Sequence, residues 1–277
     1  MDFNVSKNTY LCQSFQLSIT LESLSIQQIL TENIAKSSFV FLKNSHKSKI
    51  PLYRLKNSSR VIYRCAIALS LAKNTNLPAT EIAIALVNSL PRNSPIGSQS
   101  QLDFSIRVSN EGWIDFYLSD RSLCFWLQSL LQATASSLPK FPDPSLPPCS
   151  ENVFPIQYAH ARCCSLLRLA REEGSIEIEF NDSEKLFVVH PAEQNSIDRL
   201  LELADVKASD RPQDWYKLAA RLTQTFLELH RQCPIWERTN PNFLRSAKVR
   251  LGLIQVTQYF LNWLLIEKIG VTAPQEL

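Results

Sequence analysis

The stretch Phe154-Pro-Ile-Gln-Tyr-Ala-His-Ala-Arg-Cys-Cys-Ser-Leu-Leu-Arg-Leu-Ala170 decides how the second half of the chain is expected to fold. Its apolar residues recur every three or four positions, which is the period of an amphipathic helix. This pattern predicts a buried stripe made of Ile156, Ala159, Cys163, Leu166, Leu167 and Ala170. A separate face of the same helix carries Tyr158, Arg162, Ser165 and Leu169.

The face that begins at Tyr158 has two interpretations. A tyrosine ring can stack on an unpaired RNA base while Arg162, or Arg168 further along, pairs with its phosphate. The same residues can instead form an ordinary contact between helices. His160 could donate a hydrogen bond to RNA, but a structural role is expected for it and for His230, because a lone histidine in a helix usually has its ring nitrogens satisfied within the fold.

Further helices are predicted in the second half at about 194–205, 212–232 and 241–269. A small hairpin is expected where Ile176–Phe180 and Leu186–Val189 flank the turn Asn181-Asp182. The apolar stretch 251–266 is interrupted by Gln255, Gln258 and Asn262, which favours a buried helix over a membrane span. The second half is therefore expected to be an all-α bundle with a small β-hairpin insertion.

The first half mixes helical and strand patterns, which predicts an α+β domain. Helices are expected at 25–36, 60–72, 80–90 and 120–131, and short strands within 37–56. Apolar residues alternate over Leu102–Val108 and again over Ile114–Leu118, around a turn at Asn110-Glu111-Gly112. This alternation is typical of a strand pair with one buried face.

A proline-rich connector separates the two halves. Residues 136–148 contain Pro139, Pro142, Pro144, Pro147 and Pro148. Proline lacks a backbone donor and fixes φ, so the run disfavours both a helix and a central strand. We predict one domain at 1–135, a linker at 136–150 and a second domain at 151–277.

Positive charge is concentrated near the start of the chain. The net charge is only +3, but residues 33–80 contain nine Lys or Arg and no acidic residue. Such a stretch either follows the backbone of an RNA or forms a solvated face. The candidate RNA-binding residues within it are Lys43, Lys47, Lys49, Arg54, Lys56 and Arg60.

Several classes of site have no support in the sequence. The five glycines form no phosphate-binding loop, and the seven cysteines include no Cys-x-x-Cys pair. No nucleophile elbow or His-Glu-x-x-His motif is present. We therefore expect no catalytic residue, no metal and no cofactor, with reduced thiols in a cytoplasmic setting.

Three segments in the second half resemble, in order, the anticodon-binding domain of arginyl-tRNA synthetases. The Gln-Tyr-Ala-His-Ala-Arg core of residues 157–162 is similar to its opening helix. Trp215–Pro234 looks like its middle helix and exit, and Arg250–Pro274 looks like its last helix and tail. The resemblance implies a helical domain of the DALR type that contacts tRNA.

Two segments in the first half resemble the N-terminal domain of the same synthetases. They are Ser58–Leu90, with its core at Ala66–Lys73, and Val108–Leu118. The family uses an Asn near the tRNA D-loop in the second segment, and this chain has Asp115 there. Trp113 and Tyr117 either stack on a base near the tRNA elbow or pack the domain. A carboxylate cannot donate a hydrogen bond and repels phosphate, which lowers the expected affinity for tRNA.

The catalytic domain that lies between these parts in the synthetases has no counterpart in the short linker. The chain has no His-x-Gly-His sequence, and its single methionine is Met1, which excludes a Lys-Met-Ser-Lys-Ser loop. We expect a non-catalytic protein that binds tRNA or another structured RNA, with or without a separate enzyme. The alternatives are an interaction subunit of a larger complex that has lost RNA binding, and an inhibitor or partner of the true synthetase.

Overall fold

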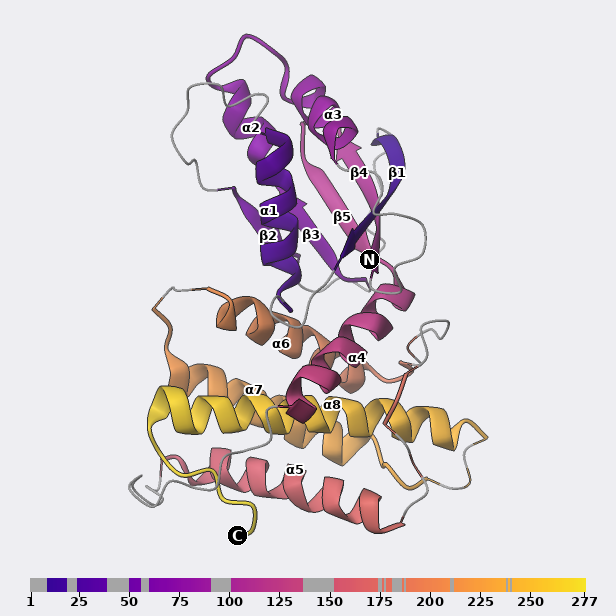
Figure 1. Ribbon diagram of the computed structural model, residues 1–277, viewed down its shortest axis with the longest axis vertical. Coiled ribbons are helices and arrows are strands. Elements are labelled where there is room, and N and C mark those ends of the chain that lie inside the picture. Colours follow the sequence, from indigo (N-terminus) through magenta and orange to yellow (C-terminus); the bar gives the residue numbers. More distant parts are fainter. Residues whose placement is uncertain are drawn as a thin grey trace. The chain divides into compact units, whose positions relative to one another are not determined.

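A computed structural model describes residues 9–18, 24–38, 50–55, 60–90, 101–136, 152–173, 176, 178–180, 186, 188–209, 212–237, 239 and 241–277. The chain divides into two compact units, Met1–Trp126 and Leu127–Leu277. The first unit combines a sheet with helices, and the long helices that follow make up the second (Figure 1). The expected sequence of an α+β part and a helical part is confirmed.

The sheet of the first unit has five antiparallel strands in the order β1-β4-β5-β3-β2. Their bounds are β1 Thr9–Ser18, β2 Leu52–Arg54, β3 Ile62–Cys65, β4 Gln101–Ser109 and β5 Ile114–Leu118. The predicted pair β4 and β5 is confirmed, and so is the turn between them. Gly112 in this turn has a φ of 90°, and a Cβ there would lie 2.7 Å from Cβ of Ala79. Only glycine meets both requirements.

In the described part of this unit lie α1 Ile26–Ser38, α2 Ile67–Ala72 and α3 Ala79–Ser89, and α4 Asp120–Ser136 begins in it and continues into the second unit. α1 contacts β2 and α3 contacts β4 (Figure 1). The face of β4 and β5 that is buried carries Leu102, Phe104, Ile106, Val108, Ile114, Phe116 and Leu118. Side chains alternate along a strand, so the opposite face carries the polar and aromatic residues between them.

The predicted helix at 60–72 is wrong in its first half. Residues 62–65 form β3, which lies between β5 and β2, and the helix α2 begins only at Ile67. An inner strand with both faces largely covered reads as a nearly continuous apolar run, and Val61-Ile-Tyr63 is such a run. Periodicity alone does not distinguish such a short run from a turn of helix.

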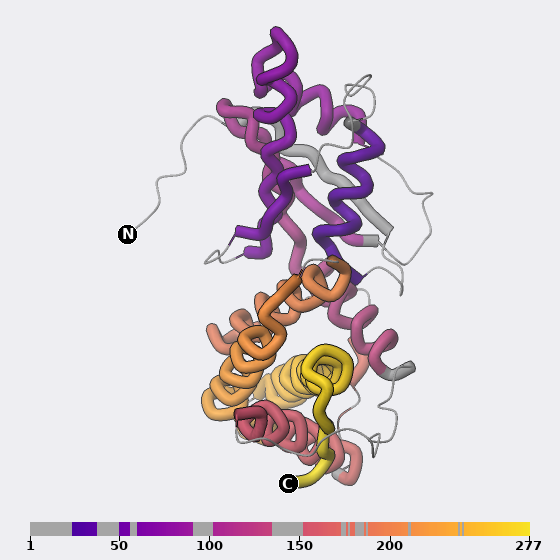
Figure 2. The backbone as a smooth tube through the Cα atoms, turned by 90° about the vertical axis from the view of Figure 1, so that its left-hand side faces the viewer, coloured from indigo at the N-terminus to yellow at the C-terminus, as the bar shows by residue number. Residues whose placement is uncertain are grey.

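The second unit contains the larger part of α4, followed by α5 Phe154–Glu173, α6 Pro191–Lys207, α7 Trp215–Gln232, α8 Phe243–Trp263 and the π-helical turn η1 Leu264–Ile269. α5 and α6 each pack against both α7 and α8. α8 is buried along most of its length, as expected for the stretch 251–266. The chain then passes from η1 down to α5 (Figure 2). No helix in the described parts of the chain is long and apolar enough to cross a membrane.

The small hairpin expected at 176–189 is not found among the described residues of that segment. Residues 176, 178–180, 186, 188 and 189 are in no strand. Phe180 is instead buried, and its backbone N–H donates to the side chain of Gln128 at 2.9 Å. A Cβ at Gly252 of α8 would lie 3.2 Å from the Phe180 ring. Among the described residues, Phe180 is therefore buried by packing against the helices and not by strand pairing.

The proline-rich connector lies largely outside the described residues. α4 continues to Ser136, and the description resumes at Asn152. The described structure therefore gives no account of residues 137–151.

Candidate nucleic-acid interface

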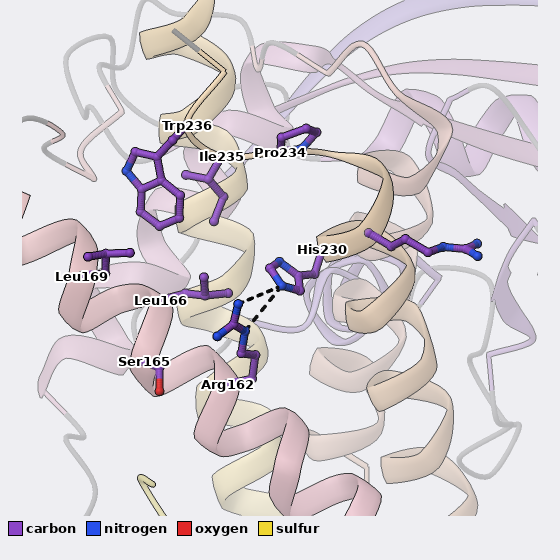
Figure 3. A pocket seen from close by; sticks show the side chains of 9 residues that line it. Arg162, Ser165, Leu166, Leu169, His230, Pro234, Ile235 and Trp236 are labelled. Carbon is purple, nitrogen blue, oxygen red and sulfur yellow. Dashed lines mark hydrogen bonds between the residues drawn. The ribbon is translucent and has the colours of Figure 1, made fainter. Parts of the chain in front are cut away.

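A cleft of about 480 Å³ lies in the second unit, between α5, α7 and the segment that follows α7. Figure 3 shows Arg162 reaching from α5 toward His230 of α7, while Trp236 and Ile235 face Leu166 and Leu169. The lining combines cationic, aromatic and aliphatic side chains. They are Arg162, Ser165, Leu166, Leu169, His230, Arg231, Pro234, Ile235 and Trp236.

Arg162 and His230 form the polar centre of the cleft. Nε and Nη2 of Arg162 each lie 3.4 Å from Nε2 of His230 (Figure 3). A guanidinium only donates, so Nε2 of His230 accepts and the ring is neutral with its proton on Nδ1. Burial lowers the pKa of His230, and the charge of Arg162 lowers it further. The His230 ring also lies parallel to Phe226, with centroids 6.0 Å apart.

The opposite part of the cleft is apolar. Leu166 and Ile235 are buried, whereas Leu169 is 42% exposed. Trp236 faces these residues across the opening (Figure 3). An apolar and aromatic wall next to a guanidinium suits a ligand that has a flat base and an anionic group, as a nucleotide has.

Three of the four residues predicted to share one face of α5 line this cleft: Arg162, Ser165 and Leu169. Tyr158 does not line it and lies one turn earlier on the same helix. Its side chain is 45% exposed, and its ring stacks on Phe154 with centroids 6.5 Å apart. The α5 face therefore presents two aromatic rings followed by the cleft.

Arg168 lies outside the cleft. Its Nη1 is 2.8 Å from a carboxylate oxygen of Glu276 in the C-terminal segment. Arg168 is six positions after Arg162, which places the two residues about 120° apart around the helix. The structure therefore does not bring these two predicted RNA contacts together.

His160 is fully buried between α5, α8 and the C-terminal segment. Its Nδ1 is 2.8 Å from the carbonyl oxygen of Pro274, and its Nε2 is 3.2 Å from Nε2 of Gln258. The carbonyl accepts and the amide donates, so the ring is neutral with its proton on Nδ1. Gln157 donates to the carbonyl of Thr272 at 2.8 Å. The two side chains hold the C-terminal segment on α5, as a structural histidine would.

The basic stretch of the first unit is described only in part. Lys43, Lys47, Lys49 and Lys56 lie outside the described residues. Arg60 is exposed just before β3. Arg54 is half-buried at the end of β2, on the same side of the strand as the buried Leu52.

The sheet face opposite α1 and α3 carries a row of paired positions across four strands: Tyr53, Arg64, Asp115 and Arg107. Arg64 donates two hydrogen bonds to the Asp115 carboxylate, both at 2.7 Å, and these raise the pKa of Arg64. The guanidinium of Arg64 also lies 5.5 Å from the centre of the Trp113 ring.

Arg107 stands over the Tyr117 ring at 4.8 Å on the same face. Trp113 and Tyr117, which were predicted either to stack on a base or to pack the domain, are half-exposed. Guanidinium groups beside aromatic rings are also what single-stranded nucleic acids stack on. The geometry of this face is compatible with base stacking and with packing of the domain. Asp115 neutralises Arg64, one of the two arginines on the face.

Sequence reasoning missed the α7 side of the cleft, above all Arg231 and Trp236. Arg231 directly follows His230, and Trp236 comes two residues after Pro234, where the predicted helix ends. The paired basic residues at the end of a helix were a usable signal. The contact between Arg162 and His230, which are 68 positions apart, had none.

Comparison with known proteins identifies this part of the chain. Residues 156–277 match the DALR anticodon binding domain family. The chain is 30% identical over 130 residues to the arginine–tRNA ligase of Synechococcus sp. strain JA-3-3Ab, covering 44% of this chain and 22% of the relative. It is 35% identical to the arginine–tRNA ligase of Chloroflexus aurantiacus over 130 residues, covering 44% of this chain and 21% of the relative.

A third relative, the arginine–tRNA ligase of Pelodictyon phaeoclathratiforme, is 35% identical over 134 residues, or 45% of this chain and 23% of the relative. The chain thus spans less than a quarter of the length of these curated relatives. No solved structure matches the chain significantly. The predicted resemblance of the second half is confirmed, while that of residues 58–90 and 108–118 stays a prediction.

Proposed function

We propose that this chain, which carries a DALR anticodon-binding domain similar to part of the arginine–tRNA ligases, binds tRNA and does not itself attach an amino acid to it. The observation that carries the proposal is the cleft between α5 and α7, where Arg162 lies beside an apolar wall. A guanidinium pairs with phosphate, and the wall covers the face of an unpaired base. The anticodon loop of a tRNA offers a phosphate and an unpaired base together.

Two further surfaces support the same assignment. One continues from this cleft along α5, and the other lies on the sheet of the first unit. The stacked rings of Phe154 and Tyr158 continue the α5 face with exposed aromatic area. Arg107 over Tyr117 offers a second cationic and aromatic contact on the sheet. Stacking on aromatic side chains contributes about 1–3 kcal/mol per base.

The non-catalytic part of the proposal rests on the sequence. There is no His-x-Gly-His motif, and the only methionine is Met1. Only the proline-rich residues 136–150 lie between the two predicted domains, 1–135 and 151–277. Without groups that hold ATP and stabilise the charge of an adenylate, the transfer reaction lacks its main source of rate enhancement.

A docking role for the same surface is the second candidate function. Its specific support is the exposure of large apolar residues around α5 and α7, namely Phe154, Tyr158, Leu169, Tyr216 and Leu227. Exposed apolar area of this kind also suits a protein partner. The two candidates differ in whether the chain binds tRNA when no other protein is present.

The test is binding of the full chain to labelled total tRNA by fluorescence anisotropy, at about 50 and 200 mM salt, with a length-matched unstructured RNA as competitor. We expect saturable, salt-sensitive binding that prefers tRNA. Arg162→Glu is expected to weaken it at least about tenfold, the value of one charge-assisted hydrogen bond.

Arg221→Glu is the matched control. Arg221 is exposed on α7 and lies nine residues before His230, which places it on the opposite side of the helix. Equal binding to both RNAs, or none, would refute tRNA binding and favour the protein-docking candidate. Formation of arginyl-tRNA by the purified chain with ATP and arginine would refute the non-catalytic part.

A further inference from the structure

A cluster of aromatic rings lies at the end of the helical unit where α6 ends, α7 begins and α8 passes into η1. Trp215 and Trp263 pack edge to face with their ring centres 5.7 Å apart, and Phe260 packs on Trp263 at 6.2 Å. Trp263 is almost fully buried, whereas Trp215 and Tyr259 are partly exposed. The cluster therefore offers a rigid aromatic floor that reaches the surface.

Two lysine ammonium groups stand on this floor. Nζ of Lys207, the last residue of α6, is 4.9 Å from the centre of the Trp263 ring and 4.7 Å from that of Tyr259. Nζ of Lys268, in η1, is 5.3 Å from Trp263 and 5.1 Å from Trp215. Because both nitrogens are near the same ring centre, they are no more than about 10 Å apart.

The two charges are held in place but not neutralised within the described part of the chain. Lys207 donates to the hydroxyl oxygen of Tyr259 at 2.6 Å, and both lysines are exposed. No ion pair joins either of them to a described carboxylate. Contact with an aromatic face stabilises an ammonium group without supplying a countercharge.

This arrangement lowers the cost of binding an anion. A free lysine loses much rotamer freedom when it contacts a ligand, whereas these two are already restrained by rings and, for Lys207, by a hydrogen bond. Each ammonium group keeps donors to spare, since a lysine has three. Neighbouring phosphates on one RNA strand are spaced so that two such groups can meet one phosphate or two consecutive ones.

The cluster lies within reach of an RNA that occupies the cleft. Trp215 begins α7 and His230 lies near its end, so the helix rises about 22 Å between them. An anticodon loop and the first pairs of its stem span such a distance. We infer that Lys207 and Lys268 form a second site that binds backbone phosphates of the same tRNA, an inference that rests on the proposed function. The two lysines lie on the rings of Trp215, Tyr259 and Trp263.

The experiment measures the slope of log Kobs against log salt concentration for tRNA and the full chain. Each phosphate contact contributes about 0.7 to this slope on single strands. Lys207→Gln and Lys268→Gln are each expected to lower the slope by about 0.7 and the affinity about fivefold at about 0.1 M salt. Lys217→Gln is the matched control, because it removes an exposed charge at the start of α7.

Further arms separate the possible failures. If the wild-type chain binds tRNA and both lysine variants behave like Lys217→Gln, the phosphate site is refuted and the proposed function stands. This is the result expected if the true ligand of the two lysines is an acidic protein surface. If the variants melt at lower temperature but keep the wild-type slope, the lysines are structural only. Lys268→Arg is expected to keep the slope. Absence of tRNA binding by the wild-type chain would refute both proposals.

Discussion

Arg250 and Glu193 form a buried ion pair, with Nε of Arg250 2.7 Å from Oε1 of Glu193 and with 6% and 0% of the two side chains exposed. Arg250 also donates to the carbonyl oxygen of Pro234. The other carboxylate oxygen of Glu193 accepts from the backbone N–H groups of Val189 and His190 at 2.9 and 3.1 Å. The pair thus joins α8 to the start of α6 and to a residue that lines the cleft.

Removing the arginine of this pair is expected to destabilise the helical unit strongly. Arg250→Met leaves a carboxylate buried without its partner, which costs about 3–5 kcal/mol. Urea unfolding followed by circular dichroism measures the change in free energy. Arg171→Met, at an exposed position near the end of α5, is the control and is expected to change stability by less than about 0.5 kcal/mol. A loss below about 1 kcal/mol for Arg250→Met would contradict this account of the pair.

The buried His160 is expected to make stability fall in acid. Burial lowers its pKa below the usual 6.5, although the hydrogen bond with the Pro274 carbonyl opposes this. Below pH 6.5 the unfolded chain therefore takes up a proton that the folded chain resists, so the free energy of unfolding falls as pH drops. Burial lowers the pKa of His230 too, which adds to the effect in the same direction.

Unfolding free energies at about pH 7.5 and 5.5 test this linkage for the wild type and for His160→Gln. His160→Gln is expected to be less stable than the wild type at both pH values, because Pro274 and Gln258 lose a well-placed partner. Between the two pH values, however, its free energy of unfolding is expected to fall less than that of the wild type. His190→Gln serves as the comparison, because His190 is a half-exposed histidine at the start of α6. An unchanged pH dependence in His160→Gln would show that His160 is not responsible.

Replacing Asp115 tests whether the sheet face of the first unit takes part in binding RNA. Asp115→Asn removes the charge that Arg64 now neutralises through its two hydrogen bonds. We expect stability to fall by about 1–2 kcal/mol, since charge-assisted bonds are weakened. The affinity for tRNA is expected to rise about fivefold at about 0.1 M salt, the effect of one additional phosphate contact.

Anisotropy titrations with the folded Asp115→Asn protein measure this change. Asp120→Asn is the control, because Asp120 is an exposed carboxylate at the start of α4. An affinity that stays the same or falls would mean that the sheet face does not meet RNA phosphates.

The helical unit could be predicted well because its local and overall patterns agree. α5 and α7 each have an apolar stripe of helical period, α8 is a long buried helix, and the predicted bounds of all three are close to those observed. The first unit was harder. β3 was predicted as helix because an inner strand lacks alternation, and β1, an edge strand that pairs with β4, was not predicted at all. Pairing between distant segments decides such strands, and a local pattern does not record it.

The candidate cleft was half predictable for the same reason. Tyr158, Arg162, Ser165 and Leu169 share a face by helical geometry alone, and three of them line the cleft. Their partners on α7 and beyond depend on how two helices pack. In the described part of the expected hairpin, Phe180 alternates with polar neighbours yet packs against Gly252 of α8. Alternation marks a half-buried segment and does not specify what buries it.

The most direct test of the central claim is a footprint of the full chain on tRNA, mapped nucleotide by nucleotide with hydroxyl radicals. We predict protection of the anticodon loop by the wild type and by Arg221→Glu, and loss of that protection in Arg162→Glu. Protection confined to the acceptor stem, or anticodon-loop protection that persists unchanged in Arg162→Glu, would contradict the assignment of the α5–α7 cleft as the tRNA site.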